Sequence, residues 1–395
     1  MIIKPRIKGF VCITAHPTGC MQNVMDQVEY ARKHQVLAEG KPKRVLVLGS
    51  STGYGLSSRI VASFSAGAET LGVYFERPPS SEKTASAGFY NSLAFAKLAR
   101  EQGIRSVEVN GDAFSNECKA DVVEKAKEMG GQFDLVIYSL ASPRRTDPMD
   151  GVSYRACLKP IGSVYKNKTL NTDRREVKEV VIEPANDAEI QSTEKVMGGE
   201  DWLLWTDLLI KEDLLAPNCQ NLAYSYIGPE VTRPIYRNGT IGKAKEHLES
   251  SAVRISQMMK DGCGGRAYVS VNKAVVTQAS SAIPVVPLYV SILFKVMREK
   301  GTHEGCIEQI SRLFEHRLYS GGELPVDESN RIRLDDWEME PEIQNKIMEI
   351  WPQVNTENLT ELTNFNEYQD EFLSLFGFGH PQVNYDLEVD PLNPF

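Results

Sequence analysis

Short apolar runs alternate with amphipathic segments along most of this chain. The runs are typical of strands covered on both faces of a parallel sheet. They stand at 45–48, 70–76, 106–110, 133–143, 221–228 and from 266 onward. Helices are expected between them, from 53, over 87–103, from a cap at Ser115 to 129, over 202–211 and over 240–260. This alternation predicts an α/β fold with a doubly wound, Rossmann-like parallel sheet.

The alternation loosens over residues 144–201, which are hydrophilic and charged with weak β periodicity. Such a stretch predicts an insertion that shapes a substrate pocket rather than a separate core. We therefore expect one enlarged Rossmann-like domain over 1–395. Its parts are a first dinucleotide-binding half at 44–143, the insertion, a catalytic and substrate-binding half at 202–300 and a C-terminal helical portion at 301–395.

No apolar stretch predicts a membrane span. The segment from Lys273 to Gly301 is rich in small and apolar residues, but polar residues such as Thr277 interrupt it and Pro284 and Pro287 break it. It predicts a buried helix over a cofactor, or the wall of a site for a fatty chain. The N-terminus lacks the apolar core of a signal peptide, so a cytoplasmic protein without a membrane partner is expected.

Composition excludes several classes of function. A net charge of −9, without clustered Lys, Arg and aromatic residues, argues against nucleic-acid binding. The seven cysteines are scattered without a C-x-x-C pair, which predicts reduced thiols. The six histidines show no metal-binding spacing, and His247 on a helix is more often a packing residue than a ligand, so no metal is expected.

A glycine-rich turn follows the first apolar run. Gly49, Gly53 and Gly55 stand between the strand and the next helix, where they permit a tight turn and close approach of a phosphate. The second strand ends at Glu76, placed to bind the adenosine ribose of a dinucleotide. This acid favours NADH over NADPH, although Arg77 could soften the repulsion of a 2′-phosphate. A turn that binds no phosphate is the alternative.

The carboxyl ends of the next two strands should face the same ligand. Asp112 and Ala113 follow one strand, and Ser139, Leu140 and Ala141 follow the other, beside the expected adenine and ribose. Asp112 is a candidate partner for the adenine amino group. It could equally be a turn residue or a helix cap.

The candidate catalytic residues are tyrosines and a lysine. Tyr224 and Tyr226 alternate on a strand and are expected on one face. Tyr236 must precede the next helix, because nine positions on one helix would point it away from Lys245. A nearby ammonium would lower the pKa of the phenol, which could then act as an acid, and would hold the ribose hydroxyls of a nicotinamide cofactor. The alternatives are a surface lysine and a packed aromatic residue.

These residues lie within longer motifs that resemble one family. GSSTGYG, YSLASP, KVMGGEDW, AYSYIGPE, GTIGKAKEHLE, SVNKAVVTQAS and the frame Tyr-x8-Lys closely resemble the single-chain NADH-dependent trans-2-enoyl thioester reductases, the FabV or trans-2-enoyl-CoA reductase family. The resemblance implies reduction of the 2,3 double bond of an enoyl thioester carried by CoA or acyl carrier protein. It further implies an enlarged short-chain-dehydrogenase fold, NADH as cofactor and a monomer.

The resemblance also implies a role for each matching residue. Tyr236 looks like the proton donor and Tyr226 a substrate contact. The implied cofactor residues are Gly49, Ser50, Ser51, Thr52, Gly53, Tyr54, Phe75, Glu76, Asp112, Ala113, Leu140, Ala141, Lys245, Val275, Val276 and Thr277. Two other functions stay open: a carbonyl reductase, against which the wide Tyr–Lys spacing counts, and a non-catalytic dinucleotide sensor.

Overall fold

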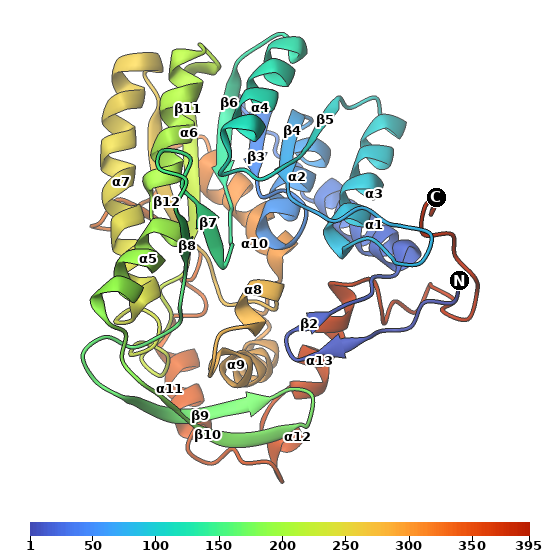
Figure 1. Cartoon of the computed structure of the whole chain (residues 1–395), viewed down its shortest axis with the longest axis vertical. Helices are drawn as coiled ribbons and strands as arrows, with labels where there is room; N and C mark the ends of the chain where they lie inside the picture. The colour runs from blue at the N-terminus through green and yellow to red at the C-terminus, as the bar shows by residue number, and fades with distance from the viewer.

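The computed structural model describes all 395 residues, and one seven-stranded parallel sheet forms its centre (Figure 1). Its strands are β3 (Arg44–Leu48), β4 (Glu69–Tyr74), β5 (Ser106–Asn110), β6 (Phe133–Tyr138), β11 (Leu215–Ser225), β12 (Arg266–Val271) and β13 (Arg331–Arg333). Across the sheet they lie in the order β13-β12-β11-β6-β3-β4-β5. The winding direction reverses between β3 and β6, so the predicted doubly wound sheet is confirmed.

Helices cover both faces of the sheet. The alternating side chains of β3 show why: Val45 and Val47 belong to one apolar core, and Leu46 and Leu48 belong to another. The first face carries α1 (Pro17–Lys33), α2 (Gly53–Phe64), α3 (Ala87–Glu101) and α10 (Cys306–Leu313). The second carries α4 (Asn116–Met129), α6 (Glu200–Lys211) and α7 (Thr240–Cys263). The Ser115 hydroxyl accepts from Cys118 N–H at 3.1 Å, which is the predicted cap of α4.

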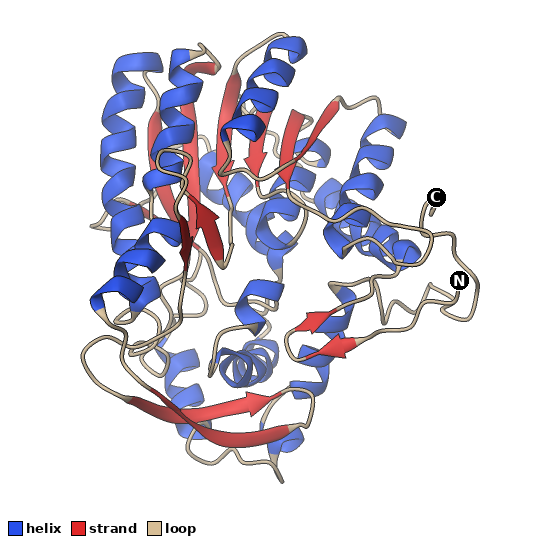
Figure 2. Cartoon of the chain, in the orientation of Figure 1, coloured by secondary structure: helices blue, strands red, loops and turns tan.

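A third apolar core lies beyond the sheet, around the buried helix α9 (Val286–Lys300). Figure 2 shows the long antiparallel hairpin of β9 (Tyr165–Asn171) and β10 (Glu176–Ile182) spanning this part of the molecule. The other elements here are α8 (Gln278–Ser281), α11 (Pro341–Ile350), α12 (Leu359–Leu362), α13 (Phe365–Ser374) and the hairpin of β1 (Ile7–Lys8) and β2 (Val11–Cys12). None of the helices combines the length and hydropathy that a membrane span requires.

Some elements differ from the expected ones. The strand expected over 133–143 ends at Tyr138, and β11 begins at Leu215 rather than 221 because an irregularity in its pairing with β6 extends it backward. Residues 144–201 contain β7 (Arg144–Thr146), β8 (Ser153–Arg155), β9, β10 and α5 (Asp187–Met197). The expected helical portion after 301 contains four α-helices and the short π-helix η1 (Phe314–Leu318), and it also contributes the edge strand β13 to the sheet.

Candidate active site

The glycine turn at the end of β3 can accept only glycine at two positions. Gly49 has φ +88°, and a Cβ there would lie 2.2 Å from the Ser139 carbonyl oxygen. A Cβ on Gly55 would lie 1.8 Å from the Gly49 carbonyl oxygen. Thr52 precedes α2 without a side-chain capping bond. The helix N-terminus therefore keeps its amide groups available for an anion, and this cradle fits a pyrophosphate.

Glu76 is held beside that turn. Its Oε1 accepts from Ser51 Oγ at 2.7 Å, and its N–H donates to Asn110 Oδ1 at 2.9 Å. A Cβ on Gly88 would lie 2.0 Å from Oε1, so glycine makes room for the carboxylate. Phe75 next to it is 75% exposed. The acid therefore lies where a ribose of a bound dinucleotide is expected.

Other expected cofactor residues follow the neighbouring strands. Asp112 Oδ1 accepts from Phe114 N–H at 3.0 Å, so this side chain does form a turn, while its other oxygen has no protein partner. Buried Ala113 follows it. Leu140 Cδ2 would lie 3.2 Å from a Cβ on Gly49, which brings this side chain onto the glycine turn, and Ala141 next to it is exposed.

The segment after β12 returns to the same turn. Val275 and Val276 are buried, and Thr277 begins α8 with its hydroxyl accepting from Ser280 N–H at 3.1 Å. The Thr277 methyl carbon would lie 3.4 Å from a Cβ on Gly53. The fold thus brings this part of the chain to the helix end that is expected to bind the cofactor.

Tyr236 and Lys245 lie at the start of α7 but do not form a pair. Tyr236 lies in the turn before the helix, as predicted, and is only 7% exposed. Its hydroxyl makes no hydrogen bond with the protein, and burial raises its pKa above the usual value. Lys245 Nζ donates instead to the Tyr224 carbonyl oxygen at 3.4 Å, and burial lowers the pKa of its ammonium to about 8. The expected lowering of the phenol pKa by Lys245 was therefore wrong.

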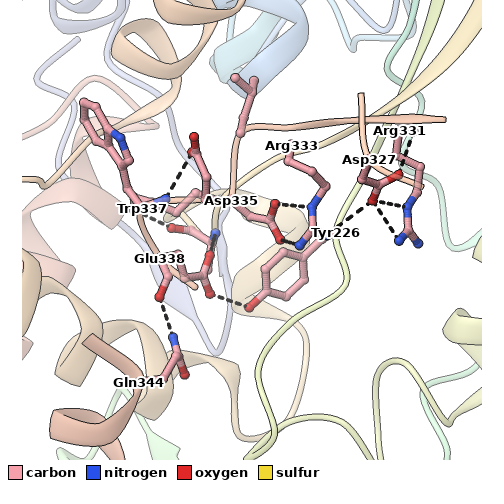
Figure 3. Close-up of polar contacts among 12 residues, drawn as sticks. Tyr226, Asp327, Arg331, Arg333, Asp335, Trp337, Glu338 and Gln344 are labelled. Carbon is pink, nitrogen blue, oxygen red and sulfur yellow. Dashed lines mark hydrogen bonds and ion pairs between the residues drawn. The ribbon is translucent and has the colours of Figure 1, made fainter. Parts of the chain in front are cut away.

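Tyr224 and Tyr226 diverge because β11 ends between them, so the expectation of one shared face was wrong. The Tyr224 hydroxyl lies 2.6 Å from Ser58 Oγ on α2. Tyr226 instead packs its ring edge-on against Tyr236, with centroids 5.0 Å apart. Its hydroxyl donates to Glu338 at 2.9 Å (Figure 3). Tyr226 and Tyr236 are therefore the tyrosines that the structure brings together.

Three residues of this site were missed from the sequence. Glu338 is fully buried and also accepts from the Tyr289 hydroxyl at 2.6 Å. Lys273, 1% exposed, donates to the Ala274 carbonyl oxygen at 2.8 Å. Neither Glu338 nor Tyr289 lies in a recognisable motif. The only sign of them in the sequence is a polar group, a carboxylate or a hydroxyl, next to apolar residues.

A doubly wound sheet with a glycine-rich anion cradle, an acid at the ribose position and a buried tyrosine defines a nicotinamide-dependent reductase. Comparison with known families specifies it further. Residues 83–319 match the family described as trans-2-enoyl-CoA reductase catalytic region, and residues 2–81 match the NAD(P)H binding domain of trans-2-enoyl-CoA reductase. The chain belongs to the trans-2-enoyl-CoA reductase family.

Individual relatives agree along the whole chain. An enoyl-[acyl-carrier-protein] reductase [NADH] of Flavobacterium johnsoniae is 54% identical over 99% of this chain and 98% of its own. A trans-2-enoyl-CoA reductase [NADH] of Ruminiclostridium cellulolyticum is 53% identical with the same coverage. The crystal structure of Treponema denticola trans-2-enoyl-CoA reductase in complex with NAD is 52% identical, covers 98% of both chains and superposes with a TM-score of 0.94.

Residues 326–389 match a family described as enoyl reductase FAD binding domain. The Rossmann mode of dinucleotide binding uses a glycine turn after a strand, but β13 is followed by Leu334 and Asp335, whose N–H groups donate to the Val271 carbonyl oxygen at 2.8 and 3.2 Å. The Asp335 carboxylate is bonded to Arg333 at 2.7 Å. No glycine occurs from 323 to 376. These residues therefore do not form a glycine cradle of the Rossmann type for a flavin dinucleotide.

Proposed function

We propose that Tyr236 is the proton donor of this NADH-dependent enzyme, which reduces the trans-2 double bond of an enoyl thioester. One observation carries the proposal: among the phenols around the site, only that of Tyr236 has no protein partner. The Tyr54 hydroxyl donates to the Lys273 carbonyl oxygen at 2.6 Å, and the Tyr224 hydroxyl lies 2.6 Å from Ser58 Oγ. The hydroxyls of Tyr226 and Tyr289 donate to Glu338 at 2.9 and 2.6 Å. A free phenol O–H can donate to a substrate oxygen without breaking another bond.

The residues present fit the cofactor. The amide groups at Gly49–Tyr54 would bind the pyrophosphate, Glu76 the adenosine ribose, and Asp112 the adenine amino group. Lys245 would bind the nicotinamide ribose, and the backbone and hydroxyl at 275–277 would bind the carboxamide. When bound, the reduced nicotinamide supplies the hydride for the β-carbon of the thioester. The Glu76 carboxylate would repel a 2′-phosphate, which supports a preference for NADH.

Tyr236 would act on the other end of the conjugated system. Addition of hydride at the β-carbon moves charge onto the thioester carbonyl oxygen, and a phenol within hydrogen-bond reach stabilises and protonates this enolate. Burial keeps the phenol protonated at neutral pH because it raises the pKa of Tyr236. The net change is one hydride and one proton added across the double bond, which leaves the saturated acyl thioester.

The cofactor and tyrosine residues of the proposed site converge within a single copy of the chain and complete it without a second copy, so we propose a monomer as the active unit. All seven cysteines are free thiols, which supports a reducing compartment such as the cytoplasm. The carrier of the acyl group, CoA or acyl carrier protein, is the part of the substrate that the site residues do not specify.

Oxidation of NADH, followed by absorbance with crotonyl-CoA as substrate, tests the activity. NADPH, a long-chain enoyl group on acyl carrier protein and a simple ketone should be compared at equal concentration. We expect rapid oxidation of NADH with an enoyl thioester and none with the ketone. Oxidation with the ketone alone would indicate a carbonyl reductase, and tight NADH binding without oxidation would indicate a sensor.

A further inference from the structure

Glu338 is a buried carboxylate that reaches the site from the far end of the chain. It lies between β13 and α11 and is 0% exposed. Its Oε1 accepts from the hydroxyls of Tyr226 and Tyr289, and its Oε2 accepts from Ala274 N–H at 2.7 Å. Burying a carboxylate costs several kcal/mol of folding free energy unless hydrogen bonds and a nearby charge compensate for the lost solvation.

The directions of these hydrogen bonds are determined by their partners. Gln344 Nε2 donates to the Tyr289 hydroxyl oxygen at 3.2 Å, so the single Tyr289 proton points to Glu338. The Ala274 N–H can only donate. Both carboxylate oxygens therefore accept at least one hydrogen bond, and the Tyr226 hydroxyl donates its single proton to Oε1 (Figure 3).

We propose that Glu338 is a positioning residue: it accepts the hydrogen bond of the Tyr226 hydroxyl, fixes the ring that packs against Tyr236, and leaves Tyr236 as the only tyrosine free to donate to substrate. Tyr226 then meets the substrate with its ring or as an acceptor. The inference rests on the proposed role of Tyr236, and it gives the segment after β13 a part in catalysis that needs no flavin.

A second connection runs from the same segment to Tyr236. Arg237, the next residue, begins a series of ion pairs that passes through α7 and β13 and ends three residues before Glu338. The series is Arg237–Glu249 at 2.9 Å, Glu249–Arg331 at 3.3 Å, Arg331–Asp327 at 2.9 Å, Asp327–Arg333 at 3.4 Å and Arg333–Asp335 at 2.7 Å. Figure 3 shows its C-terminal part next to Tyr226 and Glu338. Residues 327–338 are thus connected to Tyr226 through Glu338, and to Arg237, the neighbour of Tyr236, through Arg331 and Glu249.

Lys273, from the segment after β12, is the buried cation whose charge acts most strongly on Glu338. Burial raises the pKa of Glu338, Lys273 partly offsets that shift, and Asp335 adds to it. Burial likewise lowers the pKa of Lys273, and the charge of Glu338 partly offsets that shift. The side chains that hydrogen-bond the carboxylate are those of the two tyrosines, so its position is set by Tyr226, Tyr289 and the Ala274 N–H.

The test replaces Glu338 by Gln, alone and together with Tyr226→Phe. Gln removes the charge but keeps the size, so kcat with crotonyl-CoA should fall about tenfold or more, which is the worth of one charge-assisted hydrogen bond, while the Kd of NADH changes less than about twofold. If Glu338 acts through Tyr226, adding Glu338→Gln to Tyr226→Phe should change kcat no further.

The control is Glu108→Gln, a half-buried carboxylate that is paired with the buried Arg59 at 2.7 Å at the opposite edge of the sheet. It should lower stability without lowering kcat. If Glu338→Gln does not fold, Glu338→Asp is used instead, because it keeps the charge. Adding Glu338→Asp to Tyr226→Phe should likewise leave kcat unchanged. Equal losses with and without the Tyr226 hydroxyl, or an unchanged kcat in Glu338→Gln, would overturn the inference. A wild-type enzyme that oxidises NADH with neither crotonyl-CoA nor a long-chain enoyl-acyl carrier protein would instead refute the proposed function.

Discussion

Replacing Tyr236 by Phe should separate chemistry from stability. The Tyr236 hydroxyl has no hydrogen-bond partner, and its side chain is 7% exposed. Its removal therefore breaks no bond and leaves no buried group unpaired, and the free energy of unfolding should change by less than about 0.5 kcal/mol. If this phenol protonates the substrate, kcat should nevertheless fall by about 100-fold to 10,000-fold, the usual contribution of a general acid, or about 2.7 to 5.4 kcal/mol in the barrier.

Tyr224→Phe is the matched control with the opposite expectation. Its hydroxyl is bonded to Ser58 at 2.6 Å and faces α2 rather than Tyr236. This variant should lose about 1 kcal/mol of stability, the net worth of a neutral hydrogen bond, and keep its turnover. The pair of variants therefore predicts a crossed pattern: activity lost with stability kept, and stability lost with activity kept.

The assay is a single-turnover measurement with enzyme in excess over crotonyl-CoA, followed by NADH absorbance. Urea unfolding gives the stability, and NADH fluorescence gives the Kd of the cofactor, which should be unchanged in Tyr236→Phe. Turnover within about threefold of wild type in this variant would refute the reasoning, since such a change is far smaller than a general acid contributes. Tyr226 or water would then be the proton donor.

Three further predictions concern the cofactor site. Lys245→Met should weaken NADH binding. Because burial lowers the pKa of Lys245 to about 8, the affinity of the wild type for NADH should fall as the pH rises through 8 and the ammonium loses its charge. The variant should show no such step in fluorescence titrations. Glu76→Gln should narrow the preference for NADH over NADPH by about tenfold in kcat/KM, because the repulsion of a 2′-phosphate is removed; an unchanged ratio would place the ribose elsewhere. Gly49→Ala should cost about 1 to 3 kcal/mol in urea unfolding, because φ is +88° and the Cβ would lie 2.2 Å from the Ser139 carbonyl oxygen. Equal stability of this variant and wild type would contradict the strain argument.

The dinucleotide-binding half was predictable because its signals are local. An aliphatic run, Gly49 and Gly55 in the turn, and Glu76 at the end of the next strand all lie within about one βαβ unit, where spacing alone determines the geometry. The place of Tyr236 before its helix followed from helical periodicity in the same way. The pKa of Tyr236 could not be predicted in this way, because the direction of its shift depends on burial and on where the Lys245 ammonium points.

The site beyond the cofactor depends on long-range contacts that no spacing reveals. Glu338 lies 112 residues from Tyr226 in the chain, in the portion after 301 whose pattern predicts helices. The strand β13, three residues long, carries too little apolar pattern to be recognised. The divergence of Tyr224 and Tyr226 was likewise hidden, since strand alternation holds only where the strand continues, and β11 ends at Ser225.

The lateness of β13 in the chain affects the order in which a working enzyme can form. Its partner β12 ends at Val271, whereas β13 begins at Arg331, so their pairing closes a long loop and belongs to the slow, non-local steps of folding. During synthesis, the cofactor half can assemble while Glu338 is still absent. The tyrosine pair would gain its fixed arrangement only when nearly the whole chain has emerged, so the nascent enzyme should be able to bind its cofactor before it can turn over substrate.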